Sequence, residues 1–230
     1  MGIKIDQHDR HIRVHGFGLN GLTKPNEDLD LGNSGTSMRL LAGLLSGQNF
    51  SSNLKGDSSL SSRPMNRIIE PLKKMGAIIS LEGDTAPIAI QPSKELNGIS
   101  YELPVASAQV KSCIMLAGLY AQTDTTIIEN HQTRNHTEKM FEKFGIEIKE
   151  KYENDQKIIK VSPPKKLNPT NIDIPGDFSS ASFLIVAGLI IPNSEITIKN
   201  VGINSSRTAL LKVLIEMGAD IQINLSLIHI

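Results

Sequence analysis

Apolar and polar positions along the chain follow two different periods. Between residues 65 and 75 the apolar side chains recur with the spacing of one helical face. They are Met65, Ile68, Ile69, Leu72 and Met75. Pro64 suits the first turn of this helix and Gly76 its end, and Pro71 inside it is expected to bend it. Segments 78–81 and 146–149 alternate apolar and polar residues, which is typical of strands with one face in solvent.

A second kind of helix is apolar nearly all round. Residues 179–191 contain almost no polar position after the first turn, which predicts a buried helix rather than a surface one. Buried helices combined with half-exposed strands invert the doubly wound arrangement, in which helices cover the sheet. The pattern therefore predicts an inside-out α/β fold, with helices buried and sheets outside.

The elements occur in an order that repeats three times. The repeats begin with "LDLGNSGTSMRLLAGLL", "YELPVASAQVKSCIMLAGL" and "IDIPGDFSSASFLIVAGL". Each predicts a strand, a small polar loop, an apolar helix ending in Ala-Gly-Leu, a strand, a polar turn, an amphipathic helix ending at a glycine, and a further strand. The two sets of glycines are Gly43, Gly118 and Gly188, and Gly76, Gly145 and Gly218. The period is about 70 residues, which indicates a repeated supersecondary unit.

Both ends of the chain raise an expectation of their own. The opening "MGIKI" matches "MGAII", "FGIEI" and "MGADI", which close the repeats, so we expect Met1 to be an internal residue of a longer protein. The last six residues, "LSLIHI", alternate as a strand would. They also match the translation of a common sequencing-adapter end, and we expect 225–230 to be an adapter-derived tail.

Composition excludes several classes of function. Of 230 residues, 39% are apolar and 21% charged, and Lys plus Arg equals Asp plus Glu at 24 each. This balance argues against nucleic acid or an anionic membrane as the main partner. No apolar run approaches the roughly 20 residues that span a bilayer. One cysteine, Cys113, excludes an internal disulfide, and its apolar neighbours predict a buried side chain rather than a nucleophile. We expect a cytoplasmic, soluble protein.

The loop "LGNSGTSMR", residues 31–39, has features of an anion site. Unpaired N–H groups and the dipole at a helix start attract anions, and Gly35 would let a ligand approach the backbone. Ser34 or Thr36 could instead cap the helix without any ligand. The loop is neither a P-loop nor a dinucleotide-binding fingerprint. Local chemistry alone favours the cap.

Equivalent polar loops open the other helices. "GDSSLSSRPMNR" places Arg63 beside Pro64, where a guanidinium suits bidentate binding of carboxylate or phosphate, although a solvated surface arginine is the commoner case. "ASAQVKS" offers Ser107, Gln109 and Lys111, and Ser107 could be only an N-cap. Because these loops lie at matching points of the repeats, a symmetrical fold could gather several helix N-termini around one anion.

Two further loops carry polar side chains. "QTRNHTEKM" places Arg134 before a helix, and His131 and His136 nearby are weak evidence for a metal. "PGDFSSASF" contains Asp177, which we interpret first as a helix cap.

Taken together, these motifs resemble the 5-enolpyruvylshikimate-3-phosphate synthase (3-phosphoshikimate 1-carboxyvinyltransferase) family. The likeness covers residues 1–224, in the family order. It implies transfer of the carboxyvinyl group of phosphoenolpyruvate to the 5-hydroxyl of shikimate 3-phosphate, with release of phosphate, in the shikimate pathway of chorismate and aromatic amino acid biosynthesis. It implies no metal or organic cofactor, and a monomeric enzyme when full length.

The family fold has two domains of βαβαββ units with the substrates in the cleft between them. The resemblance then makes residues 1–170 most of the first domain and 171–224 the first unit of the second. Asp177 matches a structural aspartate there. The family's acid–base residues would lie before residue 1 and after residue 224, so the chain as written is expected to lack synthase activity and to expose apolar surface on 179–191.

The resemblance also implies a set of substrate-binding residues. On the phosphoenolpyruvate side these are Asn33, Gly35, Thr36 and Arg63. Gly35 is where a bulkier alanine is associated with glyphosate tolerance in the family. On the shikimate 3-phosphate side they are Ser107, Ala108, Gln109 and Arg134, with Gln109 reaching both substrates and Arg134 holding the phosphate.

Two other functions stay open at this point. One is UDP-N-acetylglucosamine enolpyruvyl transferase, which shares the fold but typically carries a reactive cysteine near the position of Ser58. The other is a non-catalytic repeat domain that only binds a partner or ligand.

Overall fold

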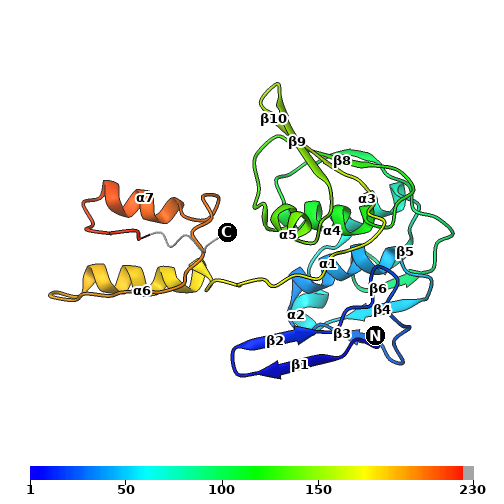
Figure 1. Cartoon of the computed structure of the whole chain (residues 1–230), viewed down its shortest axis with the longest axis horizontal. Coiled ribbons are helices and arrows are strands. Elements are labelled where there is room, and N and C mark those ends of the chain that lie inside the picture. The colour runs from blue at the N-terminus through cyan, green and yellow to red at the C-terminus, as the bar shows by residue number, and fades with distance from the viewer. Residues whose placement is uncertain (225–230) are drawn as a thin grey trace. The chain divides into compact units, whose positions relative to one another are not determined.

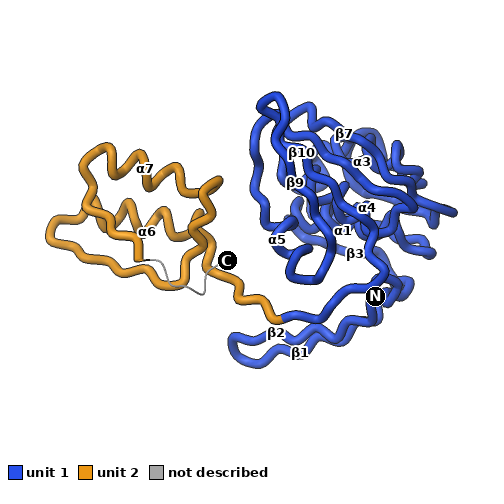
Figure 2. The backbone as a smooth tube through the Cα atoms, turned by 45° about the horizontal axis from the view of Figure 1, so that its top comes forward, with its two compact units in different colours: residues 1–170 blue, residues 171–230 orange. Residues whose placement is uncertain are grey.

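The computed structural model describes residues 1–224, which form two compact units, 1–170 and 171–224 (Figures 1 and 2). The suspected adapter segment, 225–230, lies outside the described residues. None of the helices in the described part of the chain is long and apolar enough to cross a membrane.

The first two repeats fold in the same way. The first comprises β3 (Leu29–Asp30), α1 (Gly35–Ser46), β4 (Ser52–Lys55), α2 (Ser58–Ser61), α3 (Asn66–Lys74), β5 (Ile78–Glu82) and β6 (Thr85–Gln91). The second comprises β7 (Ser100–Glu102), α4 (Ala108–Gly118), β8 (Thr125–Glu129), α5 (His136–Lys143), β9 (Ile148–Glu153) and β10 (Gln156–Val161). Their sheets have the orders β3-β4-β6-β5 and β7-β8-β10-β9, with only the first pair parallel. The predicted repeat is confirmed as a βαβαββ unit.

A hairpin precedes these units. Strands β1 (Ile5–His8) and β2 (His11–Val14) pair antiparallel, as do β5 with β6 and β9 with β10. The likeness of "MGIKI" to the segments that close the first two repeats therefore extends from sequence to structure.

The apolar helices lie inside unit 1, between the two sheets (Figure 1). Helix α4 buries side chains all round, including Val110, Cys113 and Met115. It crosses α1 so closely that a Cβ on Gly43 would lie 2.2 Å from the carbonyl oxygen of Cys113. The predicted inside-out arrangement is confirmed, as is the burial of Cys113, which raises the pKa of its thiol to about 12.

The amphipathic helices end as the glycines predict. Gly76, Gly145 and Gly218 have φ of +97°, +77° and +94°, the left-handed region that favours glycine. At Gly76 the N–H donates to the carbonyl of Lys73 and the next N–H to that of Leu72, which is a Schellman motif. Pro71 lies inside α3 as expected, and the bend there stays a prediction.

The third repeat differs from its prediction. Helices α6 (Phe178–Ile190) and α7 (Ala209–Glu216) form, but residues 171–224 contain no strand longer than a parallel bridge between Gly176 and Val201. Because no sheet covers α6, Phe183 and Ile190 are 79% and 73% exposed. The prediction of a buried helix is therefore wrong for this chain, whereas the expected exposed apolar surface is confirmed.

Candidate functional site

The start of α1 is capped by Ser34. Its Oγ accepts from the N–H of Ser37 at 3.2 Å, so Ser34 rather than Thr36 is the cap. The hydroxyl of Thr36 is thereby left for another contact, and its Oγ1 accepts from Nε2 of Gln109 at 2.7 Å. The sequence offered both cap residues, and the backbone geometry selects the earlier one.

Arg63 is held by a short relay of polar side chains. Its Nη2 donates to Oδ1 of Asn33 at 2.6 Å, and Nδ2 of Asn33 donates to both carboxylate oxygens of Asp57 at 3.1 and 2.9 Å. Asp57 caps α2, and the hydrogen bond from Asn33 is the largest cause that keeps its pKa below its usual value. Arg63 is therefore half-buried and oriented, unlike a freely solvated surface arginine.

Arg39, which was not predicted as a site residue, lies beside this relay. Its Nη1 donates to Oε1 of Gln109 at 2.5 Å. A Cβ on Gly35 would lie 3.2 Å from Nη1 of Arg39 and 3.3 Å from Nη1 of Arg63, so two guanidinium groups face the backbone at Gly35. Arg39 follows Gly35 by four residues, and helical spacing could have placed both on one face.

Within residues 1–224 no ion pair joins a carboxylate to Arg39, Arg63 or Arg67, and Asp57 acts on Arg63 only at longer range. Burial lowers the pKa of Arg39, and repulsion from Arg67 and Arg63 lowers it further. An anion bound between these groups would relieve that repulsion, and guanidinium groups bind carboxylate and phosphate with paired hydrogen bonds. The region around Gly35 is therefore suited to a small anionic ligand.

The start of α4 contributes the second half of the site. Ser107 caps α4 by accepting from the N–H of Val110 at 3.4 Å, which confirms the capping interpretation. Ala108 is the first residue of the helix. Gln109 receives a hydrogen bond from Arg39 and donates one to Thr36, so it joins the N-termini of α1 and α4.

Lys111 does not take part as a free ammonium group. It is fully buried, and its Nζ pairs with Glu138 at 2.6 Å and Glu129 at 3.2 Å. The sequence could not distinguish this position from an exposed one, because a lysine one turn into a helix is usually solvated.

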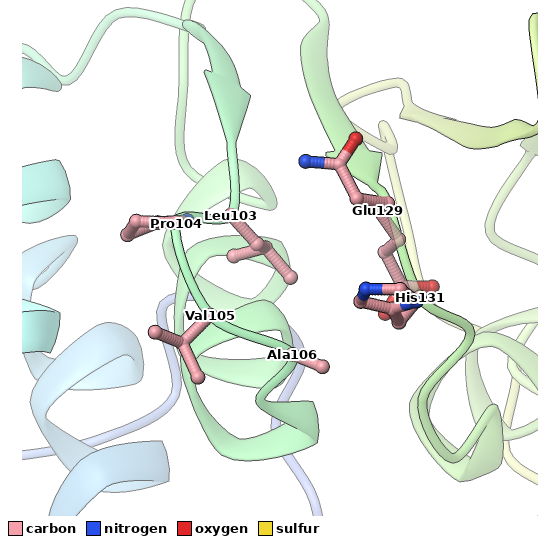
Figure 3. Close-up of a pocket in the computed structure, with 7 residues that line it drawn as sticks. Leu103, Pro104, Val105, Ala106, Glu129 and His131 are labelled. Atoms are coloured by element: carbon pink, nitrogen blue, oxygen red, sulfur yellow. The ribbon is translucent and has the colours of Figure 1, made fainter.

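Arg134 lies in the segment between β8 and α5. It is half-buried, and within residues 1–224 no hydrogen bond or ion pair holds its guanidinium. His131 lines a pocket of about 310 Å³ near this segment, and His136 begins α5. Figure 3 shows the pocket between the chain after β7 and the end of β8. Its lining residues are Leu103, Pro104, Val105, Ala106, Glu129, Asn130 and His131.

The structure thus brings together Asn33, Gly35, Thr36, Arg63 and Gln109. Along the chain, one group of the pocket's lining residues directly precedes Ser107, and the other ends three residues before Arg134. Asp177 belongs to unit 2, where it caps α6 by accepting from the N–H of Ser180 at 3.0 Å, as interpreted from the sequence.

Repeated βαβαββ units with helices inside, and polar loops at the helix starts, define an inside-out α/β protein whose helix N-termini are suited to anionic ligands. The model of the EPSP synthase (3-phosphoshikimate 1-carboxyvinyltransferase) family matches residues 1–228, and the chain belongs to that family.

Relatives and solved structures agree with this assignment. A 3-phosphoshikimate 1-carboxyvinyltransferase of Hydrogenovibrio crunogenus is 49% identical over 96% of this chain and 50% of its own length. One from Leuconostoc citreum is 48% identical over 97% of this chain and 51% of its own length. The structure of EPSP synthase from Acinetobacter baumannii superposes with a TM-score of 0.85 at 46% identity, over 96% of this chain and 49% of that one. The chain spans about half the length of these relatives.

Proposed function

We propose that the protein to which this chain belongs transfers the carboxyvinyl group of phosphoenolpyruvate to the 5-hydroxyl of shikimate 3-phosphate and releases phosphate. The observation that carries this proposal is the bridge from Arg39 through Gln109 to Thr36. The bridge brings the N-termini of α1 and α4 together, as a reaction between two anionic substrates requires.

On the phosphoenolpyruvate side, Arg63 supplies the charged contact and Gly35 the space. The relay through Asn33 and Asp57 orients the guanidinium, so little conformational entropy remains to be lost when the ligand binds. Thr36 follows Gly35 in the first turn of α1, and its hydroxyl accepts the hydrogen bond that orients the amide of Gln109.

On the shikimate 3-phosphate side, the proposed contacts come from the start of α4 and from Arg134. Ser107 and Ala108 present a hydroxyl and backbone N–H groups at a helix start, where negative charge is stabilised. The uncompensated guanidinium of Arg134 suits the phosphate of this substrate. Gln109, between the two sides, would contact both substrates.

The shikimate reaction is favoured over the two other functions considered. The named relatives are 3-phosphoshikimate 1-carboxyvinyltransferases, and Ser58, not cysteine, opens α2. An oriented arginine beside a glycine at a helix start also supports a ligand site rather than a purely structural repeat. The proposal includes a cytoplasmic enzyme, monomeric at full length, that needs no metal or organic cofactor.

The test uses a chimera in which residues 1–224 replace the matching half of the Hydrogenovibrio crunogenus relative. We expect the chimera to support growth of a bacterial strain that lacks its own EPSP synthase on medium without aromatic amino acids. The purified chimera should release phosphate from phosphoenolpyruvate only when shikimate 3-phosphate is present. A folded chimera that does neither would exclude the proposed function.

Arginine variants of the chimera separate the two sides. Arg63→Ala should raise the KM for phosphoenolpyruvate, and Arg134→Ala the KM for shikimate 3-phosphate, each by about tenfold or more because a charge-assisted hydrogen bond is lost. Arg13→Ala, on exposed strand β2, is the matched control and should change neither. If Arg63→Ala and Arg134→Ala raised the KM values for both substrates equally, the assignment of Arg63 to phosphoenolpyruvate and of Arg134 to shikimate 3-phosphate would be wrong.

A further inference from the structure

A buried ion cluster links α4 to the segment that carries Arg134. Nζ of Lys111 contacts Oε1 of Glu138 at 2.6 Å and Oε2 of Glu129 at 3.2 Å, and all three side chains are buried. Glu129 is the last residue of β8, and Glu138 lies in the first turn of α5. The two carboxylates therefore stand at the two ends of the loop 130–135, and both are held from α4.

Hydroxyl contacts tie the same loop more closely. Oγ1 of Thr133 donates to Oε1 of Glu129 at 2.5 Å, which fixes the residue next to Arg134. Oγ of Ser112 lies 2.6 Å from Oγ1 of Thr137 and joins α4 directly to α5. The backbone N–H of Lys111 donates to the carbonyl of Ser107 at 3.1 Å. Lys111 is thus bonded to the cap of α4 and, through its side chain, to both ends of the loop.

Stability does not explain these buried charges well. Well-packed apolar residues often replace a buried ion pair without loss, because the attraction between the charges only partly offsets their removal from water. Oε2 of Glu138 is buried and accepts no hydrogen bond within residues 1–224, so the cluster leaves one acceptor uncompensated. Charge-assisted hydrogen bonds do, however, fix the distance and the direction between the elements that they join.

We infer that Lys111, Glu129 and Glu138 are positioning residues that set the placement of Arg134 relative to Ser107. Their role is to adjust the protein's affinity for the phosphate of its shikimate 3-phosphate substrate. This inference rests on the proposed function, which puts Ser107 and Arg134 on that substrate. Within residues 1–224 no hydrogen bond or ion pair joins the cluster to Asn33 or Arg63, so phosphoenolpyruvate binding is not affected.

The test is a neutral replacement of the cluster in the full-length chimera. The variant Lys111→Met, Glu129→Gln, Glu138→Gln leaves no buried charge unpaired at these positions and keeps the side-chain volumes similar. We expect the KM for shikimate 3-phosphate to rise about tenfold to hundredfold, because a misplacement of about 1 Å costs that much. The KM for phosphoenolpyruvate should stay unchanged.

A matched control removes an ion pair on the same sheet. Lys160 of β10 pairs with Asp124, which precedes β8, at 2.5 Å, and within residues 1–224 no ion pair joins either residue to the cluster. The variant Lys160→Met, Asp124→Asn should leave both KM values unchanged. If it raised the KM for shikimate 3-phosphate as much as the triple variant does, a merely structural role would be the better explanation.

Thr133→Val keeps the inference testable if the triple variant fails to fold. It leaves the buried ions in place and removes only the hydroxyl beside Arg134, so it should raise the KM for shikimate 3-phosphate alone, in the same direction. An unchanged KM in Thr133→Val, or in a folded triple variant, would overturn the inference. An unsubstituted chimera without turnover would instead reject the proposed function, and the inference with it.

Discussion

At Gly35 the absence of one methyl group leaves room between two guanidinium groups. An alanine Cβ there would lie 3.2 Å from Arg39 and 3.3 Å from Arg63, closer than ordinary contact. Both neighbours are the ends of long side chains and can move, so we expect Gly35→Ala to fold normally. The shifted guanidinium groups should raise the KM for phosphoenolpyruvate in the chimera about tenfold or more.

Gly16→Ala provides the control for this substitution, because nothing lies within 4 Å of the added Cβ. The KM for phosphoenolpyruvate is measured for both variants by steady-state kinetics, and only the variant at Gly35, where the added Cβ meets neighbouring atoms, should differ from the wild type. The interpretation of Gly35 would be wrong if its alanine variant kept the wild-type KM for phosphoenolpyruvate.

Cys113 should be inert in the native protein. Burial raises the pKa of its thiol from 9.0 to about 12, so the reactive thiolate is scarce at pH 8. We expect a thiol reagent such as DTNB to label Cys113 only after unfolding in urea. Rapid labelling of the native chain at pH 8 would contradict its burial.

The same shift predicts how stability depends on pH. The folded state holds the thiol proton more tightly than the unfolded chain does, so the stability from this group is complete below pH 9. It is lost as pH rises from 9 toward 12. Between pH 8 and 10 the wild type should lose about 1 kcal/mol more than Cys113→Ala in urea titrations. Equal losses would refute the shift.

Some site residues could be predicted from the sequence, and others could not. Gly35 and Arg63 were identified from helix-start chemistry and Asn33 from the family resemblance, and the three lie together in the structure. Arg39 and Lys111 were not understood, because their roles depend on which residues of the next repeat pack beside them. Gln109, seventy positions from Arg39, is such a partner, and no local pattern reveals it.

Among the elements, α1 and α4 cross with their backbones in close contact. A Cβ on Gly43 would lie 2.2 Å from the carbonyl oxygen of Cys113, and backbone atoms cannot move aside without separating the helices. We expect Gly43→Ala to destabilise the chain by about 1–3 kcal/mol, as overpacked cores do. Urea titration measures the loss, and Gly16→Ala should stay within about 0.5 kcal/mol of wild type. Wild-type stability of Gly43→Ala would show that the helices can separate at no cost.

The elements also show what the repeat pattern could predict. The order of helices and strands in the first two repeats followed from periodicity and from the recurring glycines, because each unit is built from contiguous chain. The third repeat has the same pattern, but residues 171–224 contain no strand, since a strand needs hydrogen-bonded neighbours to form a sheet. An alternating sequence pattern indicates that a segment can form a strand. Whether it does depends on the presence of adjacent strands with which it can form hydrogen bonds.

At the scale of the whole chain, the exposed face of α6 should dominate behaviour in solution. Phe183 and Ile190 are exposed, and the formal net charge is zero with a pI near 7.0. Exposed apolar patches bind hydrophobic dyes and promote association, and low net charge does not oppose it. We expect the chain to bind ANS and to associate at neutral pH, as measured by fluorescence and light scattering.

A pair of phenylalanines on the same helix separates exposed surface from packing. Phe183→Ser removes a side chain that is 79% exposed and should lower ANS binding. Phe178→Ser removes one that is 7% exposed and should raise it by loosening unit 2. Equal responses of the two variants would mean that the dye does not report on the surface of α6.

The packing of α1 in the first repeat against α4 in the second also has a consequence for biosynthesis. The first sheet is complete once Gln91 has left the ribosome, yet its helix α1 packs against α4, which ends at Gly118. At about 5–20 residues per second, synthesis of the intervening stretch takes roughly one to five seconds. For that interval the nascent first repeat displays the apolar side of α1 that α4 later covers. Chaperones that recognise apolar helices therefore compete with the arrival of the second repeat each time the protein is made.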